Sequence, residues 1–180
     1  MTFINLSLDN PVSRLEETRT GTLISGLGAR FVMEGGAADG RVSLVEHPIP
    51  PRGLAAPMHL HTREDEYSFV LEGEWGFQLG DTIVYAKPGD LVYKPRNIWH
   101  TFWNATDEPG RLLEVISPSG FEHFFAKMSD LVEAQPPDIM EQVAQLAVDY
   151  GLQLDFDSVP GLVAAHGLAM PEPPVAVAAR

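Results

Sequence analysis

Cysteine is missing from the 180-residue chain. Its absence excludes a disulfide framework, a cysteine-based zinc site and a thiol nucleophile. Any metal in this protein therefore has to be held by histidine, aspartate or glutamate side chains.

Basic residues are scarce. Lys and Arg number 12 against 25 Asp and Glu, which gives a formal charge of -13. This charge argues against nucleic acid or an anionic membrane as the main partner. No apolar stretch approaches the ~20 residues that span a bilayer, and the first residues lack the basic and apolar regions of a signal peptide. We expect a cytoplasmic protein with no nucleic-acid or membrane partner.

Short strand candidates follow one another closely between residues 20 and 117. Turn signals separate them, among them Glu72-Gly73, Gly80-Asp81 and Pro88-Gly89-Asp90. About ten short strands at regular spacing are typical of an antiparallel sandwich or barrel. We therefore predict an all-β domain over residues 1–118, N-terminal strands included.

Beyond Pro118 the pattern becomes helical. Apolar residues recur every three to four positions over 121–132 and again over 139–147, as on one face of a helix. We predict a helical C-terminal extension over residues 119–170. The tail, 171–180, has three prolines and no apolar period, so we expect it to be mobile.

The outward-facing side of the predicted strands carries apolar residues, which have to pack against another part of the protein. Tyr67, Phe69 and Leu71 alternate with residues that point inward. The apolar stripe of the predicted helices can supply that cover, within one chain or across the two-fold axis of a homodimer.

Three histidines and a carboxylate form the most informative pattern. His59 and His61 are two residues apart, which places both imidazoles on one face of a strand. Glu66 opens the next strand, and His100 lies on a later one. Converging inside a barrel, these groups make a site for a divalent transition metal, with positions open for water, substrate or dioxygen. His47 lies at the end of another strand, and we expect it to be exposed.

These four residues fall within two spaced motifs. The first motif is Gly53-x5-His59-x-His61-x4-Glu66-x6-Gly73. The second motif is Gly89-x5-Pro95-x4-His100-x3-Asn104. Both resemble the two sequence motifs of the cupin family, with nine of the ten fixed positions matched. Asn97 stands where the second motif usually has Gly, and Asn tolerates the left-handed backbone of such a turn.

The resemblance implies an antiparallel jelly-roll β-barrel with a metal inside, to which the helical extension is added. It makes His59, His61, Glu66 and His100 the ligands of one divalent ion, which can be Fe, Ni, Mn, Co or Zn. The chain looks like small single-barrel bacterial cupins related to quercetin dioxygenases. That likeness implies a homodimeric dioxygenase that acts with dioxygen on a small aromatic or enolic substrate. We expect Glu66 to be the catalytic proton acceptor as well as a ligand, because a carboxylate leaves a metal more readily than a histidine held by a second hydrogen bond.

The cupin fold does not settle the activity. A non-redox isomerase or cyclase that uses the metal as a Lewis acid stays open, and so does a metal-dependent protein that only binds a small molecule. Oxygen uptake separates the first hypothesis from the other two. Turnover without oxygen separates the second from the third.

Alternation along the strands predicts the surroundings of the metal. If His100 points inward, Phe102 does too, and Trp75 and Phe77 share one face of their strand. With Tyr93 they are the predicted substrate-binding residues. Two interpretations stay open: these aromatic side chains form an apolar wall for a planar ligand, or they fill the barrel core.

Overall fold

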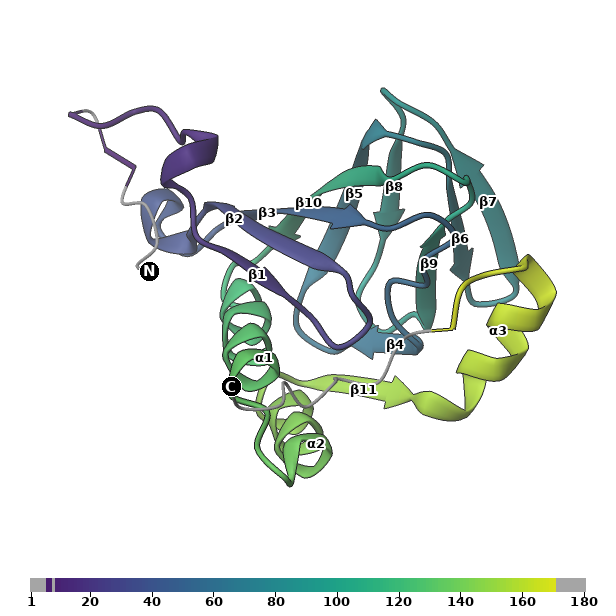
Figure 1. The fold of residues 1–180 in the computed structure, drawn as a ribbon. Coiled ribbons are helices and arrows are strands. Elements are labelled where there is room, and N and C mark those ends of the chain that lie inside the picture. Colours follow the sequence, from purple (N-terminus) through teal and green to yellow (C-terminus); the bar gives the residue numbers. More distant parts are fainter. Residues whose placement is uncertain (1–5, 8, 171–180) are drawn as a thin grey trace, which may run out of the picture.

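Two antiparallel sheets face each other in the computed structural model, which describes residues 6–7 and 9–170. Figure 1 shows them as the two walls of an antiparallel jelly roll. The predicted all-β fold with a C-terminal extension is confirmed. The tail expected to be mobile, 171–180, lies outside the described residues.

The strands of each sheet come from both halves of the chain. The first sheet contains, in spatial order, β1 (Thr20–Thr22), β2 (Gly28–Met33), β3 (Ser43–Ile49), β10 (Gly110–Ser117), β5 (Asp65–Glu72) and β8 (Leu91–Lys94). The second contains β11 (Leu152–Asp155), β4 (Met58–His61), β9 (His100–Asn104), β6 (Trp75–Leu79) and β7 (Thr82–Ala86).

Strand β10 shows how the inner face is made. It pairs with β3 on one side and β5 on the other, and every second residue along it is buried. Leu112 and Ile116 supply apolar area to the interior, but Glu114 lies between them and is 1% exposed. Its cross-strand neighbour on β5 is the buried Ser68. Polar side chains inside a sheet need partners, so this alternation already marks a polar site inside the barrel.

The helices pack on the barrel. Their bounds are α1 (Glu122–Ala134), α2 (Ile139–Asp149) and α3 (Val159–His166), and short 3-10 turns occupy Leu15–Glu17, Gly35–Ala38 and Phe156–Ser158. One hydrophobic cluster combines buried residues of both sheets with Phe121, Phe124 and Val143 from α1, its N-cap and α2. None of the described helices is long and apolar enough to cross a membrane.

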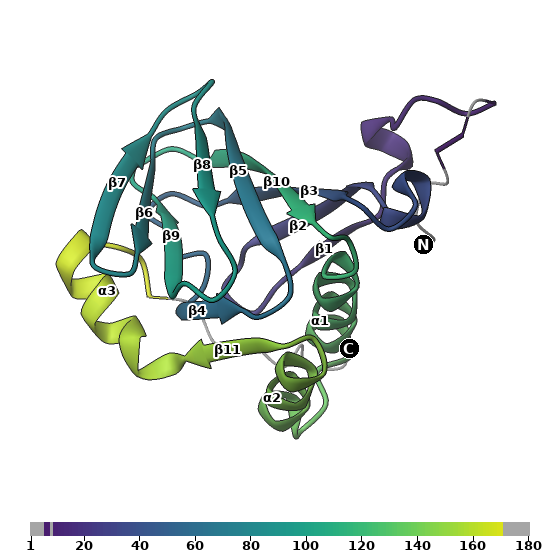
Figure 2. The same ribbon diagram turned by 180° about the vertical axis from the view of Figure 1, so that it is seen from behind.

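The extension also contains a strand, β11, that the helical pattern did not predict. It pairs antiparallel with β4, placing Leu154 opposite His59 and Leu152 opposite His61. Helix α1 packs on β1 and β3, and α2 packs on β11 (Figure 2). On the outer face of β5, the ring of Tyr67 stacks instead on Tyr93 of β8, with 5.0 Å between ring centroids.

Candidate metal centre

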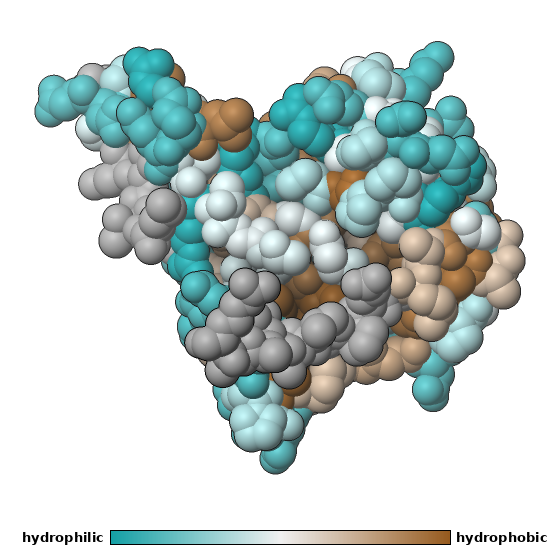
Figure 3. All heavy atoms as spheres, in the orientation of Figure 1, coloured by the Kyte–Doolittle hydropathy of each residue, from teal (hydrophilic) through white to brown (hydrophobic). Residues whose placement is uncertain are grey.

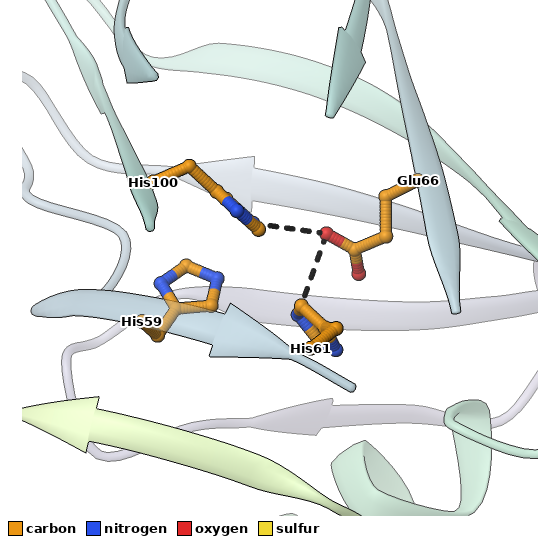
Figure 4. Close-up of side chains that lie close together, drawn as sticks. All are labelled: His59, His61, Glu66 and His100. Atoms are coloured by element: carbon orange, nitrogen blue, oxygen red, sulfur yellow. Dashed lines mark ion pairs between the residues drawn. The ribbon is translucent and has the colours of Figure 1, made fainter. Parts of the chain in front are cut away.

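Four side chains from three strands meet inside the barrel. His59 and His61 come from β4, Glu66 from β5 and His100 from β9, and all four are buried. One potential ligand atom of each lies within 4.8 Å of the others, so the group could hold a metal ion. Figure 4 shows Glu66 Oε2 facing two of the rings, at 3.5 Å from Nε2 of His61 and of His100.

Backbone carbonyls fix two of the imidazole rings. Nδ1 of His59 lies 2.9 Å from the carbonyl oxygen of Pro57, and Nδ1 of His100 lies 2.9 Å from that of Ile98. Because a carbonyl only accepts, each Nδ1 carries the proton and each Nε2 keeps its lone pair. Such a second hydrogen bond is the usual way to orient a metal-binding histidine.

The turn before β9 places His100. Asn97 adopts a left-handed conformation, with φ at 63°, and its backbone N–H donates to the carbonyl of His61 at 2.7 Å. The Asn that replaces the usual Gly thus preserves the turn, as expected. It also ties the beginning of β9 to the strand that carries the other two histidines.

His61 has a different neighbour. Its Nδ1 makes no hydrogen bond to any described residue and lies 3.7 Å from Glu64 Oε2, which also has no partner there. Both atoms are buried. The edge of the Phe121 ring, just before α1, packs against the His61 imidazole at 4.3 Å between centroids.

A buried lysine connects Glu66 to a second carboxylate. Lys94 Nζ lies 2.9 Å from Glu66 Oε2 and 2.9 Å from Glu114 Oε2, and it sits 4.4 Å from the centre of the Phe102 ring. Glu114 also accepts a hydrogen bond from Ser68 Oγ at 2.9 Å. Lys94 is 1% exposed, so water and salt weaken these ion pairs much less than they would weaken ion pairs at the surface.

Burial keeps the imidazoles of His59 and His100 neutral, and the charges around Glu66 keep its carboxylate ionised. Burial, followed by repulsion from His100 and His61, holds the pKa of His59 well below its usual value. Burial also lowers the pKa of His100. Burial raises the pKa of the Glu66 carboxyl. Electrostatic attraction to His61 and Lys94 lowers it by more, and the pKa is left well below its usual value. Neutral imidazoles and an ionised carboxylate are the forms that bind metal.

The donor set fits a divalent transition metal. His100 Nε2 is a buried nitrogen with no hydrogen-bond partner among the described residues, and coordination would satisfy it. Imidazole and carboxylate ligands suit Fe, Ni, Mn, Co and Zn alike, so the donors alone do not select one of them.

An apolar cavity of about 470 Å³ opens from the cluster. It lies among the β1–β2 turn, the beginning of α1, β11 and the beginning of α3, and Leu23, Phe124, Leu154 and Val159 are among its lining residues. Figure 3 shows hydrophobic residues in a recess near the centre of this face. His59, His61 and Glu66 form part of its wall.

Of the four predicted substrate-binding residues, only Phe102 lines this cavity. Trp75 and Phe77 have no exposed surface, are absent from the cavity lining and fill the core beside Phe102. The placement of Tyr93 in the wall is wrong: it is 47% exposed on the outer face of β8, because the alternation of that strand runs the other way.

Sequence reasoning missed four polar lining residues of the cavity, and Lys94 and His47 are the most informative of them; the other two are Ser25 and Glu114. Lys94 lies opposite Glu66 in the β5–β8 register, so a cross-strand pairing of opposite charges could have revealed which residues of β8 point inward. The expectation that His47 is exposed is wrong. It is 1% exposed and lines the cavity, because β3 continues past it to Ile49 under cover of Phe125.

Comparisons with known proteins agree with this geometry. Residues 46–116 match the family model described as "Cupin domain". No curated protein matches the sequence. Among solved structures, the chain resembles a sugar phosphate isomerase of the cupin superfamily from Silicibacter pomeroyi, with 21% identity and a TM-score of 0.53 over 59% of this chain and 75% of that one.

Two further structures show the same fold. An RmlC-like cupin from Shewanella frigidimarina is 20% identical, with a TM-score of 0.54 over 63% of this chain and 95% of that one. The nucleoside dehydratase Pac13 of Streptomyces is 17% identical, with a TM-score of 0.50 over 62% and 84% of the two chains. Both motifs, the two facing sheets and the cluster of three histidines and one glutamate agree with the family match, which identifies residues 46–116 as a cupin domain.

Proposed function

We propose that the protein is a metal-dependent dioxygenase that acts on a small aromatic or enolic molecule. The observation that carries this proposal is the opening of the cluster of three histidines and one glutamate onto a cavity whose remaining wall is almost entirely apolar. His59, His61, Glu66 and His100 would hold the ion. When bound, a divalent transition metal lowers the pKa of a coordinated hydroxyl and supports reaction with dioxygen.

The cavity wall supports an uncharged, ring-containing substrate. Lys94 is the one Lys or Arg among its described lining residues, and its ammonium is already paired with Glu66 and Glu114. No cation is left there to bind a phosphate or a carboxylate. Phe102, Phe121 and Phe124 present rings to the cavity, on which a planar molecule can pack.

Glu66 has the geometry of a proton acceptor. Its contacts with Lys94, His61 and His100 all involve Oε2, and no described residue hydrogen-bonds Oε1. We assign to Oε1 the removal of the proton from an enol or phenol hydroxyl of the substrate, while Lys94 holds Oε2 in place. The electron-rich anion then adds dioxygen in the water-poor cavity, and a C–C bond is broken with both oxygen atoms retained in the products.

Oxygen consumption tests the proposal directly. Protein loaded in turn with iron, nickel, cobalt or manganese is given flavonols, catechols and hydroxyaryl ketones. Glu66→Gln should bind the substrate but turn it over at least ~100-fold more slowly, the usual scale for losing a general base. Tyr93→Phe, on the outer face of β8, is the matched control and should keep full activity. Absence of oxygen uptake with every combination rules out the dioxygenase.

A non-redox acid–base reaction is the second candidate. The observation that favours it is Glu114, which lines the cavity and whose pKa burial raises to about 7 against the opposing charge of Lys94. A carboxyl group whose pKa lies near neutral pH can both donate and accept a proton. Turnover of the same compounds under nitrogen would support this candidate, and binding without turnover would identify a binding protein.

A further inference from the structure

His47 is a polar group of the cavity that the metal chemistry does not use. It lies on β3, belongs to neither motif, and is 1% exposed. It lines the same cavity as His59 and His61 but lies outside the cluster of potential ligand atoms.

The hydrogen bond of His47 fixes the tautomer of its imidazole ring. Nδ1 lies 2.8 Å from the carbonyl oxygen of Gly28 on β2, so Nδ1 carries the proton and Nε2 the lone pair. Burial lowers the pKa of the ring to about 4, and it is neutral at physiological pH. No described residue hydrogen-bonds Nε2. His47 is therefore a rigid, uncharged hydrogen-bond acceptor.

Aromatic rings connect His47 to the metal centre. The His61 ring packs against Phe121, Phe121 against Phe125, and Phe125 against His47, with centroid separations of 4.3, 5.1 and 4.8 Å. All three contacts are edge-to-face. A planar molecule lying along these rings from the metal cluster reaches toward His47.

The other polar groups of the cavity wall already have partners. Lys94 and Glu114 bind each other, and Ser25 Oγ donates to the carbonyl of Ala55 at 2.7 Å. Outside the metal cluster, His47 is thus the one described lining residue with a side-chain nitrogen or oxygen, Nε2, that makes no hydrogen bond within the described part of the chain. A lone acceptor in an apolar wall selects a matching donor, because an unpaired polar group in such a place is costly.

We propose that His47 is a specificity residue that accepts a hydrogen bond from a hydroxyl or N–H at the end of the substrate remote from the metal. The ligand class is then a planar apolar molecule with two polar ends: an oxygen for the metal centre and a hydrogen-bond donor for His47. A methoxy group or a carboxylate at the remote end is rejected, because an acceptor would face an acceptor. The inference rests on the part of the proposed function that places the substrate in this cavity.

Binding without turnover tests the inference. The zinc-loaded protein is titrated under nitrogen with 3-hydroxyflavone and with flavonols that carry one more hydroxyl at position 4′, 6 or 7, each with its methoxy counterpart. One hydroxyl position should tighten binding about 3- to 10-fold, the range for one net hydrogen bond, and its methoxy counterpart should not. His47→Leu should abolish that preference with metal content unchanged.

Two further variants separate the hydrogen bond from cavity shape. His47→Gln keeps an acceptor and a donor for the Gly28 carbonyl, and it should retain part of the preference even if His47→Leu folds poorly. Met128→Leu alters an apolar part of the wall and should leave the preference intact.

The outcomes distinguish this inference from the proposed function. A hydroxyl preference that survives in His47→Leu, or no preference in the wild type, overturns the role of His47 and leaves the dioxygenase standing. A His47-dependent preference, combined with no oxygen uptake in air by the iron-, nickel-, cobalt- or manganese-loaded protein on any compound of the panel, confirms the role and overturns the dioxygenase. Failure of every flavonol to bind overturns the role of His47 and leaves the dioxygenase to be decided by oxygen uptake with catechols and hydroxyaryl ketones.

Discussion

Among single residues, His100 and His61 provide the sharpest test of metal binding. His100 Nε2 is buried without a hydrogen-bond partner in the described part of the chain, and His61 lies 3.5 Å from Glu66. Replacing either with Ala should weaken zinc affinity by more than the ~10–100-fold that loss of an outer-shell partner causes. Metal content after dialysis measures the effect, with Tyr93→Phe as control. Full stoichiometry in both Ala variants would contradict the site.

His47 should also make folding stability depend on pH. Its pKa is about 4 in the folded protein because of burial, against roughly 6.5 when unfolded. The unfolded chain thus takes up the proton first, and stability present above pH 6.5 is lost as the pH falls through 4. The groups that act on the ring are Glu66 from β5, Lys94 from β8 and Glu46 from its own strand.

The expected loss from His47 is about 3 kcal/mol between pH 7 and pH 4. Chemical denaturation of metal-free protein should show the wild type losing that much more than His47→Gln over this interval. Parallel pH profiles for the two proteins would show that His47 is protonated as readily in the folded state as in the unfolded one.

The candidate ligands were predictable from sequence, whereas much of their surroundings was not. Fixed spacing identifies His59, His61, Glu66 and His100, because strand periodicity and short turns constrain where such residues point. Lys94 and Tyr93 are adjacent on one short strand, and alternation alone does not say which faces inward. That choice is made by the register with β5, where Lys94 lies opposite Glu66.

At the level of elements, β11 makes the extension part of the barrel. It covers the edge of β4, the strand that carries two of the histidines. We propose that residues 119–170 fold together with residues before 118 as one unit. A chain ending at Pro118 should be insoluble or markedly less stable, because it exposes the edge of β4 and the apolar surface beneath α1. A soluble, equally stable truncation would refute this unit.

A matched pair of point variants tests the same packing in the full chain. Leu152 on β11 is 6% exposed, whereas Val148 on α2 is 69% exposed. Leu152→Ala should lower the free energy of unfolding by about 2–5 kcal/mol, and Val148→Ala should stay within about 0.5 kcal/mol of the wild type. Equal losses of unfolding free energy for the two variants in urea denaturation would show that Leu152 of β11 adds nothing to the hydrophobic core.

The two kinds of element in the extension differed in how well sequence predicted them. Helices α1 and α2 were predictable because their apolar residues repeat at helical spacing over several turns. Strand β11 has only four residues, Leu-Gln-Leu-Asp, and so short an alternation of apolar and polar residues is a weak signal for a strand. It is a strand because the edge of β4 offers hydrogen bonds, and such tertiary pairing is not encoded locally.

At the scale of the whole molecule, we predict a homodimer. Two edge strands, β7 and β8, each carry two exposed apolar side chains: Ile83 and Tyr85 on β7, and Leu91 and Tyr93 on β8, each between 46% and 57% exposed. Light scattering should report twice the chain mass, and the double variant Leu91→Lys, Tyr93→Lys should shift it to the monomer. Val148→Lys, on α2, is the control. A monomer at every accessible concentration would disprove the dimer.

Metal binding should stabilise the entire fold, because its candidate ligands join three strands of both sheets. An ion that binds only the folded state adds about 4 kcal/mol when its concentration is 1,000 times its dissociation constant, which corresponds to a rise in Tm of roughly 10 °C for a chain of this size. Calorimetry with and without chelator measures the shift.

His100→Ala is the control for that measurement, since its Tm should hardly respond to metal. The shift should also shrink in acid, at a pH below the ordinary titration range of histidine, because burial lowers the pKa of His59 and of His100 and protons compete for these imidazoles only there. An equal response in the variant would mean that the ion acts elsewhere on the molecule, and the convergence of His59, His61, Glu66 and His100 would then have to be explained by the Glu66 ion pairs alone.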